Sequence, residues 1–188
     1  MRKLILFMHT SIDGFTARPK GEMDWVTVNE EMFEYAYERT QKADTALYGR
    51  GTYGIMQAYW PTAADKPNAS KHDVQHATWY NKVEKYVVSA TMRGQTLPNA
   101  TIISDDVADR VNQLKQQPGG EIIMFGSPNL AQYLMQHNLI DEYWLFVNPI
   151  ILGKGISLFN HIQEQIKLKL VEQIALPGGV VCLHYAKE

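Results

Sequence analysis

Short apolar runs alternate with amphipathic segments along most of this 188-residue chain, and this alternation restricts the folds open to it. The apolar runs predict strands at 3–9, 45–48, 85–90, 101–104, 121–125, 142–148, 166–175 and 180–186. The amphipathic segments predict helices at 29–42, 52–58, 72–81, 105–117 and 128–137, with Asp105 and Ser127 as N-caps. Such an order is typical of an α/β fold. The length suits one domain over residues 1–188.

The last two predicted strands break the alternation, because only Leu176-Pro-Gly-Gly179 joins them. A connection this short and rich in glycine favours a hairpin. We therefore expect a central mixed, mostly parallel sheet of about eight strands, flanked by helices and closed by a C-terminal antiparallel hairpin. Residues 61–71 are polar, carry two prolines and predict a surface loop.

The charge of the chain argues against several classes of partner. Lys and Arg number 18 and Asp and Glu 20, which gives a net charge of −2 and no basic patch for nucleic acid. No apolar stretch is long enough to span a membrane, and the single Cys182 excludes an internal disulfide. We expect a cytoplasmic protein whose partner is a small molecule.

Two glycine turns carry the strongest functional signal. Gly49-Arg-Gly-Thr52 begins a G-x-G-x-x-G pattern where a strand meets a helix, and Gly126-Ser127 stands at a second such junction. Backbone N–H groups at a helix start favour phosphate, and glycine allows close approach. Each turn alone is also compatible with a simple strand-to-helix connection. Together they suggest a dinucleotide.

The strand that follows the first turn helps to identify the nucleotide. An NAD-binding unit of the Rossmann type has Asp or Glu at the end of the next strand, whereas this chain has Ser89 and Thr91 there, followed by Arg93. Hydroxyl and guanidinium groups, including that of Arg50, donate hydrogen bonds to a 2′-phosphate, whereas a carboxylate would repel it. The pattern therefore favours NADP over NAD.

A series of motifs, in order, resembles a known family. They are Ser11-Ile-Asp-Gly-Phe15, Leu47-Tyr-Gly-Arg-Gly-Thr-Tyr53, Tyr86-Val-Val-Ser89, Phe125-Gly-Ser127, the long segment 139–155 and Leu158-Phe159. In these motifs the chain resembles the dihydrofolate reductase-like superfamily, in particular the C-terminal reductase domain of RibD, the riboflavin-biosynthesis deaminase-reductase. The resemblance extends over nearly the whole chain.

The resemblance implies an NADPH site, a dihydrofolate reductase-like fold and a homodimer. It maps the cofactor-binding residues onto Gly49, Arg50, Gly51, Thr52, Ser89, Thr91, Gly126, Ser127, Gly153 and Gly155. Many members have Gly-Gly where this chain has Gly126-Ser127. Gly153 and Gly155 either let the backbone pass close to the nicotinamide or serve their own turn.

Candidate substrate and catalytic residues come from the first strand and the first helix. The resemblance places Thr10, Ser11 and Asp13 where nicotinamide and substrate meet; Asp13 either acts on the substrate or braces its loop. Trp25 followed by Glu30 matches the substrate-binding tryptophan and acid of dihydrofolate reductases, although helix starts favour acids in any case.

We therefore expect an NADPH-dependent reductase of a small heterocyclic or carbonyl-bearing substrate, similar to the 5-amino-6-(5-phosphoribosylamino)uracil reductase domain of riboflavin biosynthesis. A catalytically silent NADP(H)-binding regulatory or resistance-type module, or a dihydrofolate reductase, is the alternative. His72 and His76 have metal-ligand spacing without a third ligand, so no metal is expected.

Overall fold

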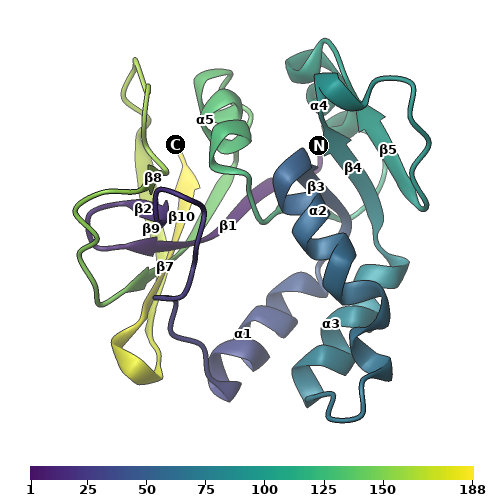
Figure 1. Ribbon diagram of the computed structural model, residues 1–188. Helices are drawn as coiled ribbons and strands as arrows, with labels where there is room; N and C mark the ends of the chain where they lie inside the picture. Colours follow the sequence, from purple (N-terminus) through teal and green to yellow (C-terminus); the bar gives the residue numbers. More distant parts are fainter.

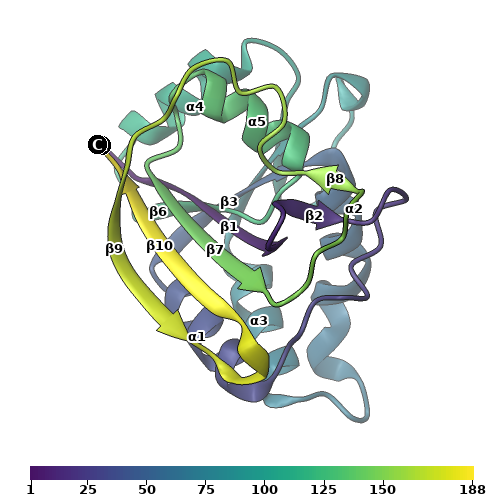
Figure 2. The same ribbon diagram turned by 90° about the vertical axis from the view of Figure 1, so that its left-hand side faces the viewer.

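The computed structural model describes residues 1–188 and is built around one large twisted sheet (Figure 1). The eight strands lie in the order β5-β4-β3-β6-β1-β7-β10-β9. They span β1 Leu4–Ser11, β3 Ala43–Gly49, β4 Glu84–Val88, β5 Ala100–Ile103, β6 Glu121–Met124, β7 Glu142–Asn148, β9 Leu168–Ala175 and β10 Val181–Lys187. All pairs are parallel except those of β10 with β7 and β9 (Figure 2), which confirms the predicted C-terminal hairpin.

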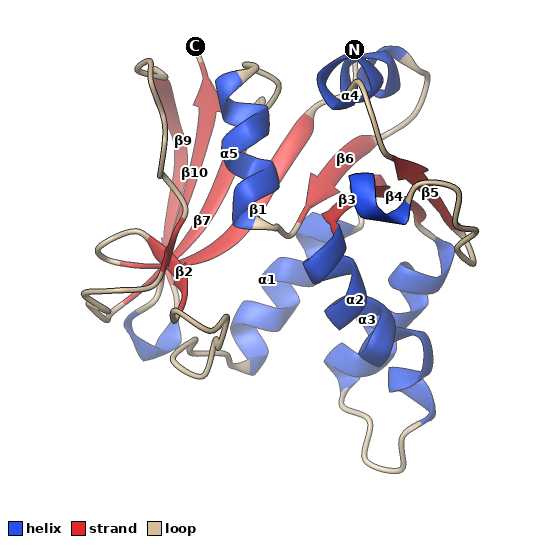
Figure 3. Cartoon of the chain, turned by 45° about the horizontal axis from the view of Figure 1, so that its top comes forward, coloured by secondary structure: helices blue, strands red, loops and turns tan.

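Helices cover both faces of the sheet. One face carries α1 Glu30–Thr40, α2 Arg50–Tyr59 and α3 Lys71–Lys82; the other carries α4 Val107–Gln116 and α5 Pro128–Gln136 (Figure 3). Because both faces are covered, central strands such as Leu4-Ile-Leu6 and Ile122-Ile-Met124 are apolar at every position. Their side chains alternate between two cores, one on each side of the sheet.

Several local predictions are wrong. The strand expected to reach Ala90 ends at Val88, and a 3₁₀ helix follows at Ala90–Met92. The predicted loop 61–71 begins inside another 3₁₀ helix, Trp60–Asp65, where Pro61 is compatible with the first turn. Asp106, rather than Asp105, is the N-cap of α4.

A small second sheet was not predicted. It pairs β2 Phe15–Ala17 with β8 Ile156–Ser157, segments too short to show a period. The chain between β9 and β10 forms a further 3₁₀ turn at Pro177–Gly179. None of the helices combines the length and the apolar character that crossing a membrane requires.

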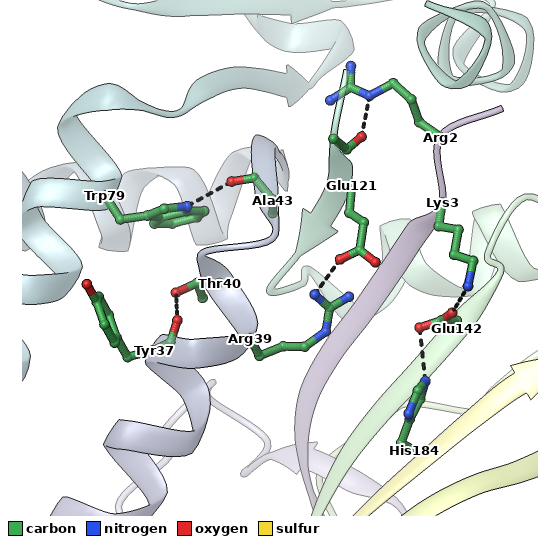
Figure 4. Close-up of polar contacts among 11 residues, drawn as sticks. Arg2, Lys3, Tyr37, Arg39, Thr40, Ala43, Trp79, Glu121, Glu142 and His184 are labelled. Carbon is green, nitrogen blue, oxygen red and sulfur yellow. Dashed lines mark hydrogen bonds and ion pairs between the residues drawn. The ribbon is translucent and has the colours of Figure 1, made fainter. Parts of the chain in front are cut away.

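Charged side chains gather at the amino ends of the central strands (Figure 4). The Arg39 guanidinium at the end of α1 pairs with Glu121 at the start of β6. Glu142 at the start of β7 accepts from Lys3 and lies 2.9 Å from Nε2 of His184. These contacts join elements that are distant in sequence.

Candidate functional site

A cleft with a volume of about 470 Å³ opens near the carboxyl ends of β1, β6 and β7. The side chains that line it come from the sheet, from α1, α2 and α3 and from the loops above them. They are Phe7, Met8, His9, Thr16, Ala17, Gly21, Met23, Val28, Met32, Phe33, Ala36, Thr40, Gly51, Thr52, Ile55, Met56, Trp60, His72, His76, Phe125, Ser127, Pro128, Phe146 and Ile156. Open α/β sheets bind ligands at this edge, and the volume suits a small molecule.

The two glycine turns lie against each other at one side of the cleft. The Gly49 N–H donates to the Gly126 carbonyl oxygen at 3.3 Å. A Cβ on Gly49 would lie 2.3 Å from the Ser127 hydroxyl oxygen, so no side chain fits there. At Gly126, a Cβ would lie 3.2 Å from the Thr52 hydroxyl oxygen, and its φ of +116° favours glycine. Two segments far apart in sequence thus form one surface.

That surface presents the starts of two helices. The N-cap residues Gly49 of α2 and Ser127 of α5 make no side-chain capping bond, which leaves first-turn N–H groups without partners from a cap. Gly51 and Thr52 line the cleft together with Ser127, and no atom lies within 4 Å of a Cβ on Gly51. Arg50, the first residue of α2, is exposed. Adjacent helix starts with open space before them fit the phosphates of a dinucleotide.

The hydroxyl residues after β4 lie one strand away from the first turn. Gly49 and Val88 are partners in the β3–β4 ladder, which places Ser89 beside the start of α2. The Ser89 and Thr91 hydroxyl oxygens are 3.1 Å apart. The Arg93 guanidinium pairs with Asp105 at 2.9 Å. None of these side chains lines the cleft itself, so they could only contact a ligand that extends beyond it.

Asp13 anchors the loop that follows β7. Its carboxylate accepts from the Ser11 hydroxyl at 2.6 Å, from the Leu152 N–H at 3.1 Å and from the Gly153 N–H at 2.7 Å. These bonds, that of Ser11 above all, lower the pKa of Asp13 and favour its ionised form. A Cβ on Gly155 would lie 2.2 Å from the Ala17 carbonyl oxygen, so this glycine permits the β2–β8 pairing. Asp13, Gly153 and Gly155 lie outside the cleft lining.

The other predicted substrate and acid residues are also outside the lining. Thr10, Ser11 and Trp25 are buried, and the Trp25 indole nitrogen has no hydrogen-bond partner. Glu30 is exposed in the first turn of α1. Toward the cleft, α1 contributes apolar side chains and one hydroxyl, and the lining contains no carboxylate.

Three histidines line the cleft, and sequence reasoning did not identify them as ligand-binding residues. Burial lowers the pKa of His9 to about 4 and that of His76 to about 3, so both are neutral at pH 7. His72 stacks on the Phe33 ring at 3.8 Å, and Nε2 of His76 has no hydrogen-bond partner. The spacing of His72 and His76 was visible in the sequence, whereas His9 stands in an apolar strand without any local signal.

Comparison with known proteins identifies the family. Residues 2–182 match the family model of the RibD C-terminal domain. The uncharacterized protein YyaP of Bacillus subtilis strain 168 is 31% identical over 186 residues, which cover 98% of this chain and 94% of YyaP.

Solved structures share the fold. A candidate riboflavin biosynthesis protein from Shewanella sp. PV-4 superposes with a TM-score of 0.74 at 19% identity, covering 99% of both chains. A deaminase and 5-amino-6-(5-phosphoribosylamino)uracil reductase from Thermotoga maritima gives 0.69 at 15% identity, covering all of this chain and 57% of that one. Dihydrofolate reductase from Enterococcus faecalis, complexed with NADP(H), gives 0.67 at 10% identity, covering 99% and 96%. The predicted dihydrofolate reductase-like fold is confirmed.

Proposed function

This chain belongs to the RibD C-terminal domain family, and from that premise we propose that it is an NADPH-dependent reductase of a small heterocyclic or carbonyl-bearing substrate. The observation that carries the proposal is the meeting of two uncapped helix starts, α2 and α5, beside the apolar cleft. This arrangement offers phosphate-binding N–H groups next to space for a ring.

The residues fit NADPH in a consistent way. Gly49 to Thr52 and Gly126-Ser127 would hold the phosphates, and the positive charge of Arg50 would add to the attraction. Ser89, next to this turn, stands where an NAD-binding unit of the Rossmann type has a carboxylate, which would repel a 2′-phosphate. NADPH, when bound, supplies a hydride to one atom of a double bond in the substrate. The other atom of that bond takes a proton from water.

One observation supports a second candidate function. No carboxylate lines the cleft, and burial lowers the pKa of each of the three histidines there, so no lining side chain is a strong candidate for the proton donor. This supports an NADP(H)-binding module without turnover as the second candidate. The same observation disfavours dihydrofolate reduction, for which a substrate-binding acid on α1 was expected.

Titration of the purified chain with NADPH and NADH, followed by nucleotide fluorescence and thermal shift, tests the proposal. We expect saturable binding, with NADPH bound at least about tenfold more tightly than NADH, which corresponds to about 1.4 kcal/mol. Absence of binding by both nucleotides refutes it. Substrate-dependent oxidation of NADPH at 340 nm then separates a reductase from a silent module.

We further propose that the chain forms a cytoplasmic homodimer through β9. This strand is one of the two edges of the large sheet, and Leu170 and Val171 are exposed on it. An exposed apolar edge strand is disfavoured in a monomer because its backbone groups can pair with another chain. Light scattering should give the mass of a dimer for the native chain and that of a monomer for Val171→Lys; a monomeric native chain contradicts this proposal.

A further inference from the structure

The cleft has no charged side chain in its lining. The lining residues include no Lys, Arg, Asp or Glu, and the three histidines that are present are held toward their neutral forms by burial. A phosphate group buried here would have no cation to pair with, and burying an unpaired charge is strongly unfavourable. The interior therefore favours an uncharged ligand.

Arg50, next to the lining residue Gly51, has no acidic partner and is the cation that the proposed function assigns to the cofactor phosphates. The cations on the segment before α1 and on α3 have acidic neighbours. Next to the lining residues Gly21 and Met23, the Arg18 guanidinium pairs with Asp24 at 2.7 Å. Segment 18–24 as a whole holds two acids, Glu22 and Asp24, for its two bases. On α3, Lys71 pairs with Glu34. The rim thus offers no cluster of unpaired cations for a phosphorylated substrate.

Asn148 determines which nitrogen of His9 carries the proton. The Asn148 side-chain oxygen accepts from the Thr27 N–H at 2.9 Å, and its amide nitrogen donates to the Phe146 carbonyl oxygen at 3.0 Å. The reverse amide orientation would place donor against donor and acceptor against acceptor. The amide nitrogen therefore lies 3.4 Å from both the Thr10 carbonyl oxygen and Nδ1 of His9, and a protonated Nδ1 would place one donor against another. In the neutral ring the proton is then on Nε2.

Nε2 of His9 makes no hydrogen bond within the chain, and the residue lines the cleft beside Phe7 and Phe146. Its ring packs on that of Phe146, with centroids 5.0 Å apart, which restricts its movement. A neutral N–H donor among apolar rings suits a carbonyl oxygen, because it satisfies that oxygen without introducing charge.

From these contacts we propose that the cleft binds an uncharged, mostly apolar ring compound with a carbonyl group, in preference to a phosphorylated one, and that His9 donates a hydrogen bond to the carbonyl oxygen. The inference rests on the proposed function and narrows its substrate class. It separates this chain from the Thermotoga reductase that it resembles, whose substrate is by its name a phosphoribosyl compound.

A matched pair of probes tests the preference. 7-Methoxy-4-methylcoumarin and 4-methylumbelliferyl phosphate share a coumarin ring and its lactone carbonyl, and differ chiefly in the phosphate. Each is titrated by fluorescence into the chain saturated with NADP⁺, so that the phosphate-binding turns are already occupied. We expect a Kd at least about tenfold lower for the neutral probe. Equal affinity, tighter binding of the phosphate ester or no binding of either overturns the inference.

Variants of His9 test the hydrogen bond. We expect His9→Leu to weaken the neutral coumarin about threefold to tenfold, the size of one hydrogen bond, and to leave NADP⁺ affinity unchanged. His9→Gln, which keeps a donor, should retain most of the affinity. His137→Leu, at an exposed position after α5, is the control for loss of a histidine. Equal affinities for all four proteins contradict the role of His9.

A gain of function gives an answer that does not depend on the folding of the His9 variants. Ile55 lines the cleft and is 72% exposed, so Ile55→Arg places a cation at the rim without disturbing the core. We expect it to tighten the phosphate ester about tenfold and to leave the neutral probe unchanged. If Ile55→Arg leaves the ratio of the two dissociation constants as it is in the native chain, the inference is contradicted.

The order of measurements separates this inference from the proposed function. NADP⁺ binding is measured first, without coumarin, and its failure counts against the proposed function. Both coumarins are also titrated into the chain without nucleotide, so the preference for the neutral probe is determined in either case. A chain that binds NADP⁺ and prefers the phosphate ester retains the proposed function and loses this inference.

Discussion

The two ends of the large sheet use opposite chemistry. At the amino end, Arg39 pairs with Glu121 and Glu142 lies between Lys3 and His184 (Figure 4). Lys115 pairs with Asp141 at 2.7 Å. At the carboxyl end, the cleft is lined by apolar side chains, a few hydroxyls and three histidines. The same parallel strands therefore end in paired charges on one side and in an uncharged cavity on the other.

The difference lies in whether charged groups have a partner of opposite charge within the chain. The charges named at the amino end have such partners, although Nε and Nη2 of Arg39 make no hydrogen bond, and these pairs join helices and strands. At the carboxyl end, Nε2 of His76 and the first-turn N–H groups of α2 have no cap or side-chain partner. Unsatisfied polar groups cost stability, and a ligand that satisfies them recovers part of that cost. This contrast supports the proposal that the carboxyl end, rather than the amino end, binds the ligand.

The largest expected effect comes from breaking a pair at the amino end. Arg39 is 3% exposed, and Glu121→Gln would leave its guanidinium buried without a countercharge. We expect a loss of about 3 kcal/mol in the free energy of unfolding, measured by urea denaturation. Asp24→Asn, which removes the partner of Arg18 in an exposed pair, is the control and should have a much smaller effect. Equal losses in the free energy of unfolding for the two variants would contradict the greater importance of the buried pair.

The second effect is a pH dependence that originates at the carboxyl end. Burial lowers the folded-state pKa of His9 to about 4, below its unfolded value, so the unfolded chain binds more protons as the pH falls. The contribution of His9 to the free energy of unfolding is fully present above about pH 6.5 and is lost as the pH falls toward 4. Between pH 7.5 and 5 the loss is about 2 kcal/mol. Urea unfolding at both pH values measures it. His9→Phe should remove this share of the pH dependence; an unchanged slope would show that His9 is solvated.

Arg50 provides a change of function without a change of stability. It is exposed at the start of α2, and Arg50→Ala removes a cation beside the proposed phosphate site. We expect NADPH affinity to fall about tenfold and the free energy of unfolding to change by less than about 0.5 kcal/mol. Fluorescence titration and urea unfolding provide the two values. Lys154→Ala serves as a control for loss of charge, and equal NADPH affinity in the two variants would count against the site.

The smallest effect is expected at the loop that Asp13 anchors. Asp13→Ala removes the acceptor for three hydrogen bonds, including that from the Gly153 N–H, at an exposed site. We expect a small loss in the free energy of unfolding and an unchanged NADPH affinity. A large loss of NADPH affinity with unchanged stability would instead assign Asp13 to the ligand site.

Features with a local signal could be predicted from the sequence. The apolar runs located all eight strands of the large sheet, and the strand-to-helix glycines located Gly49 and Gly126 before their contact was known. The β2–β8 pair could not be found, because its strands have no period and form only when distant segments meet.

The cleft was the least predictable part, because its chemistry arises from long-range contacts. The environment of His9 depends on Asn148, which is far away in sequence and is itself oriented by Thr27 and Phe146. Glu30 had the right spacing from Trp25, yet spacing along the chain does not determine whether a helix start faces a cavity. Burial and hydrogen-bond direction are properties of the folded chain alone.

Amide hydrogen exchange with and without NADPH tests the division between the two ends most directly. We predict that NADPH slows exchange in segments 49–55 and 126–130, at the starts of α2 and α5, and leaves segments 39–45 and 142–145 at the amino end unchanged. The account is contradicted if saturating NADPH slows amide exchange at the amino end and leaves exchange at both helix starts unchanged.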